Sequence, residues 1–170
     1  MPEHIFNEGV PGRDPNVFPV FTRARNPIPT LSRGQLPTDE MWNASIQLVD
    51  ANPRRRLRSV DNTYNCVGMI FASRRAWIES TEFDWIAAQD GYLRVSQPEV
   101  GDLVVYRRNA VVEHVGVILE KSVQAVGGYR TLSKWGADGE FVHDIDDLPE
   151  LLISSGLSTE YWSERKRPHR

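Results

Sequence analysis

Residues 64–78 read YNCVGMIFASRRAWI and include the only cysteine of the chain, Cys66. Apolar residues follow this cysteine at helical spacing, and they are Val67, Met69, Ile70, Phe71, Trp77 and Ile78. Asn65, with Asp61 and Asn62 before it, belongs to the residue types that cap helix starts. The pattern therefore predicts a helix with Cys66 at or just inside its first turn.

That position changes the chemistry expected of the thiol. Backbone N–H groups and the macrodipole at a helix start favour an anion, so the pKa of a thiol there is lowered toward neutrality. A lone cysteine is otherwise most often a small buried hydrophobe. One cysteine also excludes an intrachain disulfide and a multi-cysteine metal site. The helix-start setting favours a nucleophile over the packing role.

Three strand-like stretches follow downstream: QPEVGDLVVYRR at 97–108, EHVGVILEK at 113–121 and GGYRTLSKW at 127–135. Short connections between them predict an antiparallel meander. We also expect short helices at 38–50, 82–93 and 148–154, and a loop at 51–62. Helices first and strands afterwards predict an α+β fold.

His114 lies near the start of the second predicted strand. A thiol nucleophile needs a base that takes its proton and passes it to the leaving group, and the pKa of histidine suits that task. A helix start packed against the first residues of a central strand would bring Cys66 and His114 together. The sequence thus predicts a Cys–His pair.

The order of these motifs resembles the NlpC-type and CHAP-type branch of the papain-like cysteine hydrolases. The likeness rests on Asn65–Cys66 opening a helix, PEVGDLVVY at 98–106, and HVGVI at 114–118, and it spans roughly residues 60–136. It implies a papain-like fold, with a helix packed on a small antiparallel sheet. It also implies that Cys66 is the nucleophile, that His114 is the general base, and that backbone N–H groups near Cys66 form part of an oxyanion hole.

Members of that branch place a third polar residue on the strand after the histidine strand, where it orients the imidazole. Here that strand ends in Ser133, Lys134 and Trp135. Lysine cannot accept a hydrogen bond, so Ser133 is the predicted third catalytic residue. Asp138, His143 and Asp144 remain alternatives, because a fold-back could bring any of them to His114. The stretch LSKWGADGEFVHDIDDLP at 132–149 resembles related uncharacterised domains, and we expect Asn65, Lys134 and Trp135 to contact substrate.

Composition and charge limit the partners and the location that we expect for this protein. The net charge of −3 and the local character of the basic clusters argue against nucleic-acid binding. No apolar run approaches the ~20 residues of a membrane helix, and no secretory signal is recognisable, so we expect a cytoplasmic protein, with export by a dedicated system left open. No sequence pattern indicates a metal or another cofactor. The predicted organisation is an extended proline-rich arm at 1–38, a papain-like domain at 39–162 and a basic tail at 163–170.

The predicted function is a cysteine-dependent hydrolase of the amidase or peptidase type, acting on a peptide or protein amide through a thioester. The alternative is a catalytically inactive papain-like module that binds a peptide or protein partner, with the N-terminal arm helping to form the interface. The identity of the substrate and the oligomeric state stay open.

Overall fold

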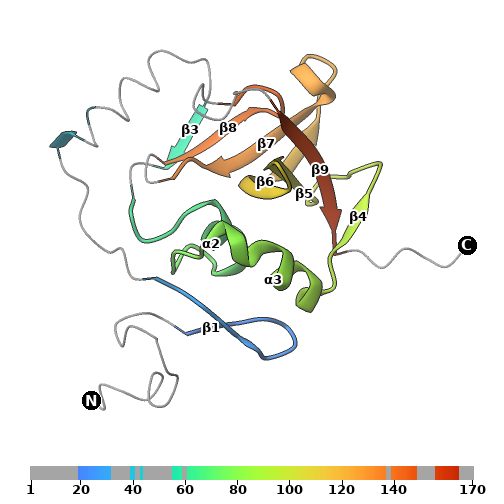
Figure 1. Ribbon diagram of the computed structural model, residues 1–170. Helices are drawn as coiled ribbons and strands as arrows, with labels where there is room; N and C mark the ends of the chain where they lie inside the picture. The colour runs from blue at the N-terminus through green and yellow to red at the C-terminus, as the bar shows by residue number, and fades with distance from the viewer. Residues whose placement is uncertain are drawn as a thin grey trace, which may run out of the picture.

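The computed structural model describes residues 19–31, 39–40, 43, 55–58, 61–136, 139–148 and 156–164. A seven-stranded antiparallel sheet has the order β3-β8-β7-β6-β5-β9-β4, and helices α2 and α3 lie below it in Figure 1. The strands are β3 (Arg55–Arg58), β4 (Leu93–Val95), β5 (Leu103–Arg108), β6 (Val111–Lys121), β7 (Tyr129–Lys134), β8 (Glu140–Asp144) and β9 (Leu157–Ser163). The predicted α+β class is confirmed.

The predicted meander is present in β5, β6 and β7. A tight turn joins β5 to β6, with Asn109 and Ala110 at positive φ. Gly127 and Gly128, also at positive φ, precede β7, as expected of residues that adopt this conformation without steric cost. Strands β4, β8 and β9 were not predicted from the sequence. Of these, β8 continues the meander, whereas β9 returns from the end of the chain to lie between β5 and β4.

Helix α2 (Cys66–Phe71) begins where it was predicted but is shorter than expected. The chain leaves the helix at Ala72, and Ser73 and Arg74 then adopt positive φ angles of 49° and 67°. The apolar residues Trp77 and Ile78, which extended the predicted helix, instead lie in a returning segment where Trp77 forms an isolated bridge with Leu31. The periodicity therefore combined two segments that pack on the same core.

Helix α3 (Phe83–Asp90) confirms the helix predicted within 82–93. It follows a single 3-10 turn, η1 (Ser80–Glu82), and ends at Gly91, which is left-handed with φ 80°. Of the helix predicted at 38–50, only residues 39, 40 and 43 are described, and they are helical. The helix predicted at 148–154 lies outside the described residues, apart from residue 148.

Two regions differ from their predictions. The predicted loop at 51–62 contains β3, which pairs antiparallel with β8. Within the predicted N-terminal arm, β1 (Val20–Phe21) and β2 (Pro27–Ile28) pair with each other, and Val20 and Ile28 are buried in the core beside the helices. Residues 19–31 therefore pack on the domain, while residues 1–18 lie outside the described part of the chain.

The two faces of the central strands enter different apolar clusters. Leu103 and Val105 of β5 pack with α2 and α3 in a larger core. Val104 and Tyr106, which alternate with them, belong to a smaller cluster with Ile118 and with residues that follow β8. This alternation with a period of two decides which face each candidate site residue occupies.

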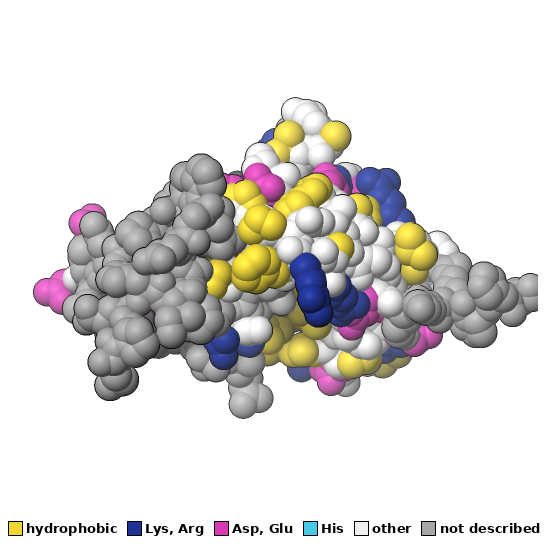
Figure 2. Space-filling view, turned by 90° about the horizontal axis from the view of Figure 1, so that it is seen from below, with side chains coloured by type: hydrophobic (Ala, Val, Ile, Leu, Met, Phe, Trp, Pro, Cys, Tyr) yellow, Lys and Arg dark blue, Asp and Glu magenta, His cyan; other side chains and the backbone are white. Residues whose placement is uncertain are grey.

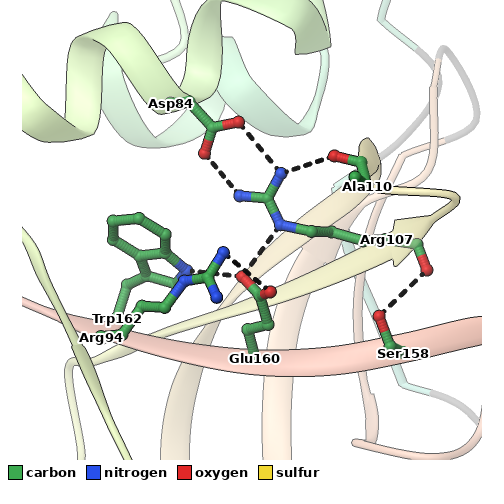
Figure 3. Close-up of polar contacts among 7 residues, drawn as sticks. All are labelled: Asp84, Arg94, Arg107, Ala110, Ser158, Glu160 and Trp162. Carbon is green, nitrogen blue, oxygen red and sulfur yellow. Dashed lines mark hydrogen bonds and ion pairs between the residues drawn. The ribbon is translucent and has the colours of Figure 1, made fainter.

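A buried arginine of β5 ties α3 to β9 (Figure 3). The guanidinium of Arg107 donates to both carboxylate oxygens of Asp84, at 2.5 and 3.0 Å, and to Oε2 of Glu160 at 2.8 Å. It also donates to the carbonyl oxygen of Ala110 at 3.0 Å. Helix α3, the β5–β6 turn and β9 thus meet at one planar cation.

The face seen from below in Figure 2 carries hydrophobic side chains interspersed with basic ones. Exposed large apolar residues of the described chain include Phe21, Leu31 and Trp85. None of the helices within the described residues is long and apolar enough to cross a membrane.

Candidate active site

Asn65 fixes the start of α2. Its Oδ1 accepts a hydrogen bond from the backbone N–H of Gly68 at 2.9 Å, which is the capping bond predicted from the sequence. Its Nδ2 donates to the carbonyl oxygen of Ile78 at 2.7 Å, so the same side chain also holds the segment that returns after the helix. Asn65 is buried, and both ends of its carboxamide are used within the protein.

Cys66 is the first residue of α2 and is 7% exposed. The helix packs against β6 and β7, and the thiol lies close to the backbone N–H of Val115, the residue after His114. Burial raises the pKa of the thiol, while the amides of Val115, Val67 and Cys66 and the charge of Lys134 oppose that rise. Burial dominates, so the resting sulfur is a protonated thiol, contrary to the lowered pKa expected from the sequence.

His114 lies in β6 and is 3% exposed. Its strand partner is Tyr106, and the two ring centroids are 5.8 Å apart. Burial lowers the pKa of His114 to about 3, and electrostatic interaction with the neighbouring His143 acts in the same direction. The imidazole is therefore neutral at physiological pH, and its Nε2 atom has no hydrogen-bond partner.

The fold brings the backbone of β6 beside Cys66, but the side chains of Cys66 and His114 do not meet. The thiol belongs to the larger core together with Val115. Because side chains alternate along a strand, the ring of His114 lies on the opposite face, against Tyr106 of the smaller cluster. Among the described residues, no hydrogen bond links the sulfur to the ring. The predicted Cys–His contact is thus absent from this structure.

Ser133 does not orient His114 either; it bonds to His143. Ser133 Oγ and His143 Nε2 are 2.6 Å apart, and His143 Nδ1 lies 2.8 Å from the carbonyl oxygen of Asp144. A carbonyl can only accept, so Nδ1 carries the proton and Nε2 accepts from the hydroxyl. The Nε1–H of Trp135 donates to the same Oγ at 3.2 Å. We call this chain of bonds, from Asp144 O through His143 to Ser133, the Ser133–His143 relay.

The antiparallel pairing of β8 with β7 produces the fold-back that was considered for His143 and Asp144. Strand β8 pairs with β7 and places His143 opposite Thr131. His143 therefore lies diagonally across from Ser133, whose own partner is Phe141. Two of the alternatives, His143 and Asp144, are therefore linked to Ser133, with Asp144 contributing its main-chain carbonyl. The third, Asp138, lies outside the described residues.

Lys134 is fully buried, which differs from the expected contact with substrate. Its Nζ donates to the carbonyl oxygens of Asp61 at 2.8 Å and Gly136 at 2.6 Å, and lies 5.1 Å from the centroid of the Tyr64 ring. The ammonium thus ties the segment leading into α2 to the end of β7. Because its charge lowers the pKa of the Cys66 thiol, Lys134 also acts on the candidate nucleophile.

Trp135, the other predicted substrate contact, is also buried. Its ring stacks on Phe141 with centroids 4.3 Å apart and lies 5.4 Å from the ring of His143. Contact of Asn65, Lys134 and Trp135 with a substrate stays a prediction, and in this structure all three side chains pack inside the domain.

Sequence reasoning missed Glu140. This buried carboxylate accepts from the hydroxyl of Tyr64 at 2.7 Å and pairs with the guanidinium of Arg74. It therefore connects β8 to the residues on both sides of α2. A single glutamate between glycine and phenylalanine carries no recognisable motif, so only the pairing of β8 with β7 could have indicated it.

Within the described residues, no group of three or more histidine, cysteine, aspartate or glutamate side chains could hold a metal ion. Comparison of this chain with protein-family models, with curated proteins and with solved structures finds no match. Function must therefore be inferred from the residues themselves.

Proposed function

We propose that the protein is a cysteine-dependent hydrolase of the amidase or peptidase type with a papain-like fold. The observation that carries the proposal is the position of the only thiol in the chain. It lies at the first residue of α2, where the amides of Val115, Val67 and Cys66 favour its ionised form. Val115 directly follows the candidate base, His114, in β6. The motif order that resembles the papain-like hydrolases agrees with this juxtaposition.

In the proposed reaction, Cys66 Sγ attacks the carbonyl carbon of an amide, and the thiol proton passes to the neutral ring of His114. The S–C bond of a thioester forms, the C–N bond breaks, and His114 returns the proton to the leaving amine. Water, deprotonated by His114, then hydrolyses the thioester and restores the thiol. No cofactor takes part in these steps. A pKa near 3 makes His114 a weak base in the resting state. Because its ring lies on the sheet face opposite the thiol, the proposed reaction also requires the backbone of β6 to turn the ring away from Tyr106 and toward the sulfur when substrate binds.

The test uses p-nitrophenyl acetate as an activated acyl donor, with mass spectrometry to locate the acetyl group. Because the chain has one cysteine, thiol acylation can only occur at Cys66. We expect acylation of the folded wild type, and a rate lowered by about 100-fold or more in His114→Gln, as is typical for loss of a general base. Thermal unfolding of the variant checks that it is folded. Acylation no faster than that of a free thiol, and unchanged in His114→Gln, would exclude the hydrolase.

The burial of both groups favours a second candidate, a catalytically inactive papain-like module that binds a peptide or protein. A protonated thiol on one sheet face and an unprotonated ring on the other are what a packing role requires. In that case Cys66→Ala would leave partner binding and stability almost unchanged, and His114→Gln would not alter thiol reactivity. A cytoplasmic location stays a prediction under either candidate.

A further inference from the structure

Lys134 and Cys66 lie on the same face of the sheet. A Cβ atom at Gly116 would lie 3.2 Å from Ser133 Cβ, so these two positions share a face. Gly116 is two residues after His114 in β6, which puts His114 on that face as well. Lys134 follows Ser133 in β7, so its side chain emerges on the other face, where α2 packs and Cys66 enters the larger core. Lys134 therefore shares a face with the thiol, and His114 does not.

Two hydrogen bonds hold the Lys134 ammonium beside the start of α2. Its Nζ donates to the carbonyl oxygens of Asp61 at 2.8 Å and of Gly136 at 2.6 Å. It also lies 5.1 Å from the centroid of the Tyr64 ring, whose face attracts a cation. Both carbonyl groups are neutral, so these bonds fix the position of the positive charge without cancelling it. Because Lys134 is fully buried, water and salt screen this charge much less than they would at the surface.

The charged side chains around Lys134 leave the thiol face positive. Glu140 is the strand partner of Lys134 in β8, and its carboxylate accepts from Arg74 Nε at 2.5 Å and from the Tyr64 hydroxyl at 2.7 Å. The carboxylate of Asp61 accepts from its own loop at the exposed surface. Helix α2 contributes no acidic residue in its first turn. One buried carboxylate thus shares this face with two cations.

A positive charge at this place acts on the ionised form of Cys66. Burial raises the pKa of the thiol, because an uncompensated anion is strongly disfavoured away from water, and the charge of Lys134 opposes that rise. His114 cannot supply a compensating charge in the resting state, because its ring is neutral and lies on the other face. The candidate nucleophile therefore has a fixed cation on its own side of the sheet.

We propose that the buried ammonium of Lys134 is the counter-ion of the Cys66 thiolate, and so a positioning residue for the nucleophile. This inference rests on the proposed hydrolase and deepens it, because it names the group that makes the thiolate accessible in a buried site. In the proposed reaction the thiol proton still passes to His114. Lys134 keeps its own protons throughout and lowers the free energy of the thiolate that the departing proton leaves behind.

The test measures the ionisation of Cys66 directly, by NMR of the full chain labelled with ¹³C at the cysteine β carbon. Because the chain has one cysteine, the label gives one resonance, and its chemical shift distinguishes thiol from thiolate without a reagent having to reach the sulfur. Lys134→Met removes the charge. Lys134→Gln also removes it but keeps N–H donors for the two carbonyl oxygens, in case the methionine variant does not fold. Lys121→Met is the matched control, because Lys121 is exposed at the end of β6.

We expect the pKa of the Cys66 thiol to rise by about one unit or more in Lys134→Met and Lys134→Gln, and to keep its wild-type value in Lys121→Met. Acylation by p-nitrophenyl acetate near neutral pH should fall by about tenfold in the Lys134 variants, in proportion to the lost thiolate, and this loss should shrink as pH rises. An unchanged thiol pKa in a folded Lys134 variant would overturn the proposal, as would a wild-type thiol that stays protonated up to about pH 10.

The roles of Lys134 and of the hydrolase can fail separately, because the titration does not depend on acyl transfer. A raised thiol pKa in Lys134→Met, together with no His114-dependent acylation, would retain the thiolate–ammonium pair and exclude the hydrolase. His114-dependent acylation, together with an unchanged thiol pKa in Lys134→Met, would retain the hydrolase and exclude the role of Lys134.

Discussion

Tyr64 donates its hydroxyl hydrogen bond to Glu140 across 2.7 Å and so joins the segment before α2 to the first residue of β8. The same carboxylate accepts from Arg74 Nε at 2.5 Å, just after the helix. Cys66 lies between these two attachments in the sequence. The position of the candidate nucleophile relative to the sheet therefore depends on the buried Glu140 carboxylate, which no sequence motif indicated.

Glu140→Gln should destabilise the fold by about 2–3 kcal/mol. Breaking a buried ion pair costs about 3–5 kcal/mol, and the partial exposure of Arg74 lowers that figure. Urea unfolding followed by tryptophan fluorescence measures the change. Glu120→Gln is the matched control, because Glu120 is exposed and pairs with Arg130 at 3.5 Å, so it should cost at most about 0.5 kcal/mol. Equal losses in the two variants would contradict the role assigned to Glu140.

His114 should make the protein acid-sensitive. Its pKa is about 3 in the folded state against 6.5 for the free side chain. Between these values the unfolded chain binds the extra proton, so the free energy of unfolding falls as pH falls, by about 1.4 kcal/mol per pH unit. His114→Gln should remove this contribution. Urea unfolding at about pH 6.5, 5.5 and 4.5, where most carboxylates stay ionised, measures both slopes, and parallel slopes would show that His114 is not buried in its neutral form.

The sequence predicted the structure correctly where a local pattern is compatible with only one kind of element. The cap at Asn65 and the strands β5 and β6 form as predicted, because side-chain capping is a local effect and each strand is a short apolar run bounded by turn residues. The prediction failed where a contact depends on which face of a strand a side chain occupies. The residues Cys66 and His114 were read as partners from their order, but a one-residue alternation in β6 turns Val115, not His114, toward α2. Strand β9 was missed because its partner β5 is distant in the sequence.

Gly116→Ala should destabilise the sheet by about 1–3 kcal/mol, as overpacking of a filled core does. The new Cβ would lie 2.4 Å from Thr131 Cγ2 and 3.0 Å from the carbonyl oxygen of Leu132. Thr131→Ser removes the clashing methyl group, so the double variant Gly116→Ala/Thr131→Ser should recover part of the loss. Thermal unfolding of the two single variants and the double variant forms a cycle. Strictly additive effects would mean that the two side chains do not meet across β6 and β7.

Arg107 should contribute more to stability than Arg94, although both pair with Glu160 (Figure 3). The Arg107 side chain is 5% exposed and that of Arg94 is 62% exposed. Arg107→Met should cost about 3 kcal/mol, because it leaves Glu160 and the carbonyl of Ala110 without their buried donor. Arg94→Met should cost less than about 1 kcal/mol.

The same cluster distinguishes the two acidic partners of Arg107. The side chain of Asp84 is 57% exposed and that of Glu160 is 20% exposed. Water therefore competes more strongly for the guanidinium at Asp84, although Arg107 makes two hydrogen bonds to that carboxylate. A double-mutant cycle of Arg107→Met with Glu160→Gln should therefore give a larger coupling energy than one with Asp84→Asn. Measured by urea unfolding, a larger coupling to Asp84 would mean that the paired geometry at the start of α3, and not burial in the sheet, holds Arg107 in place.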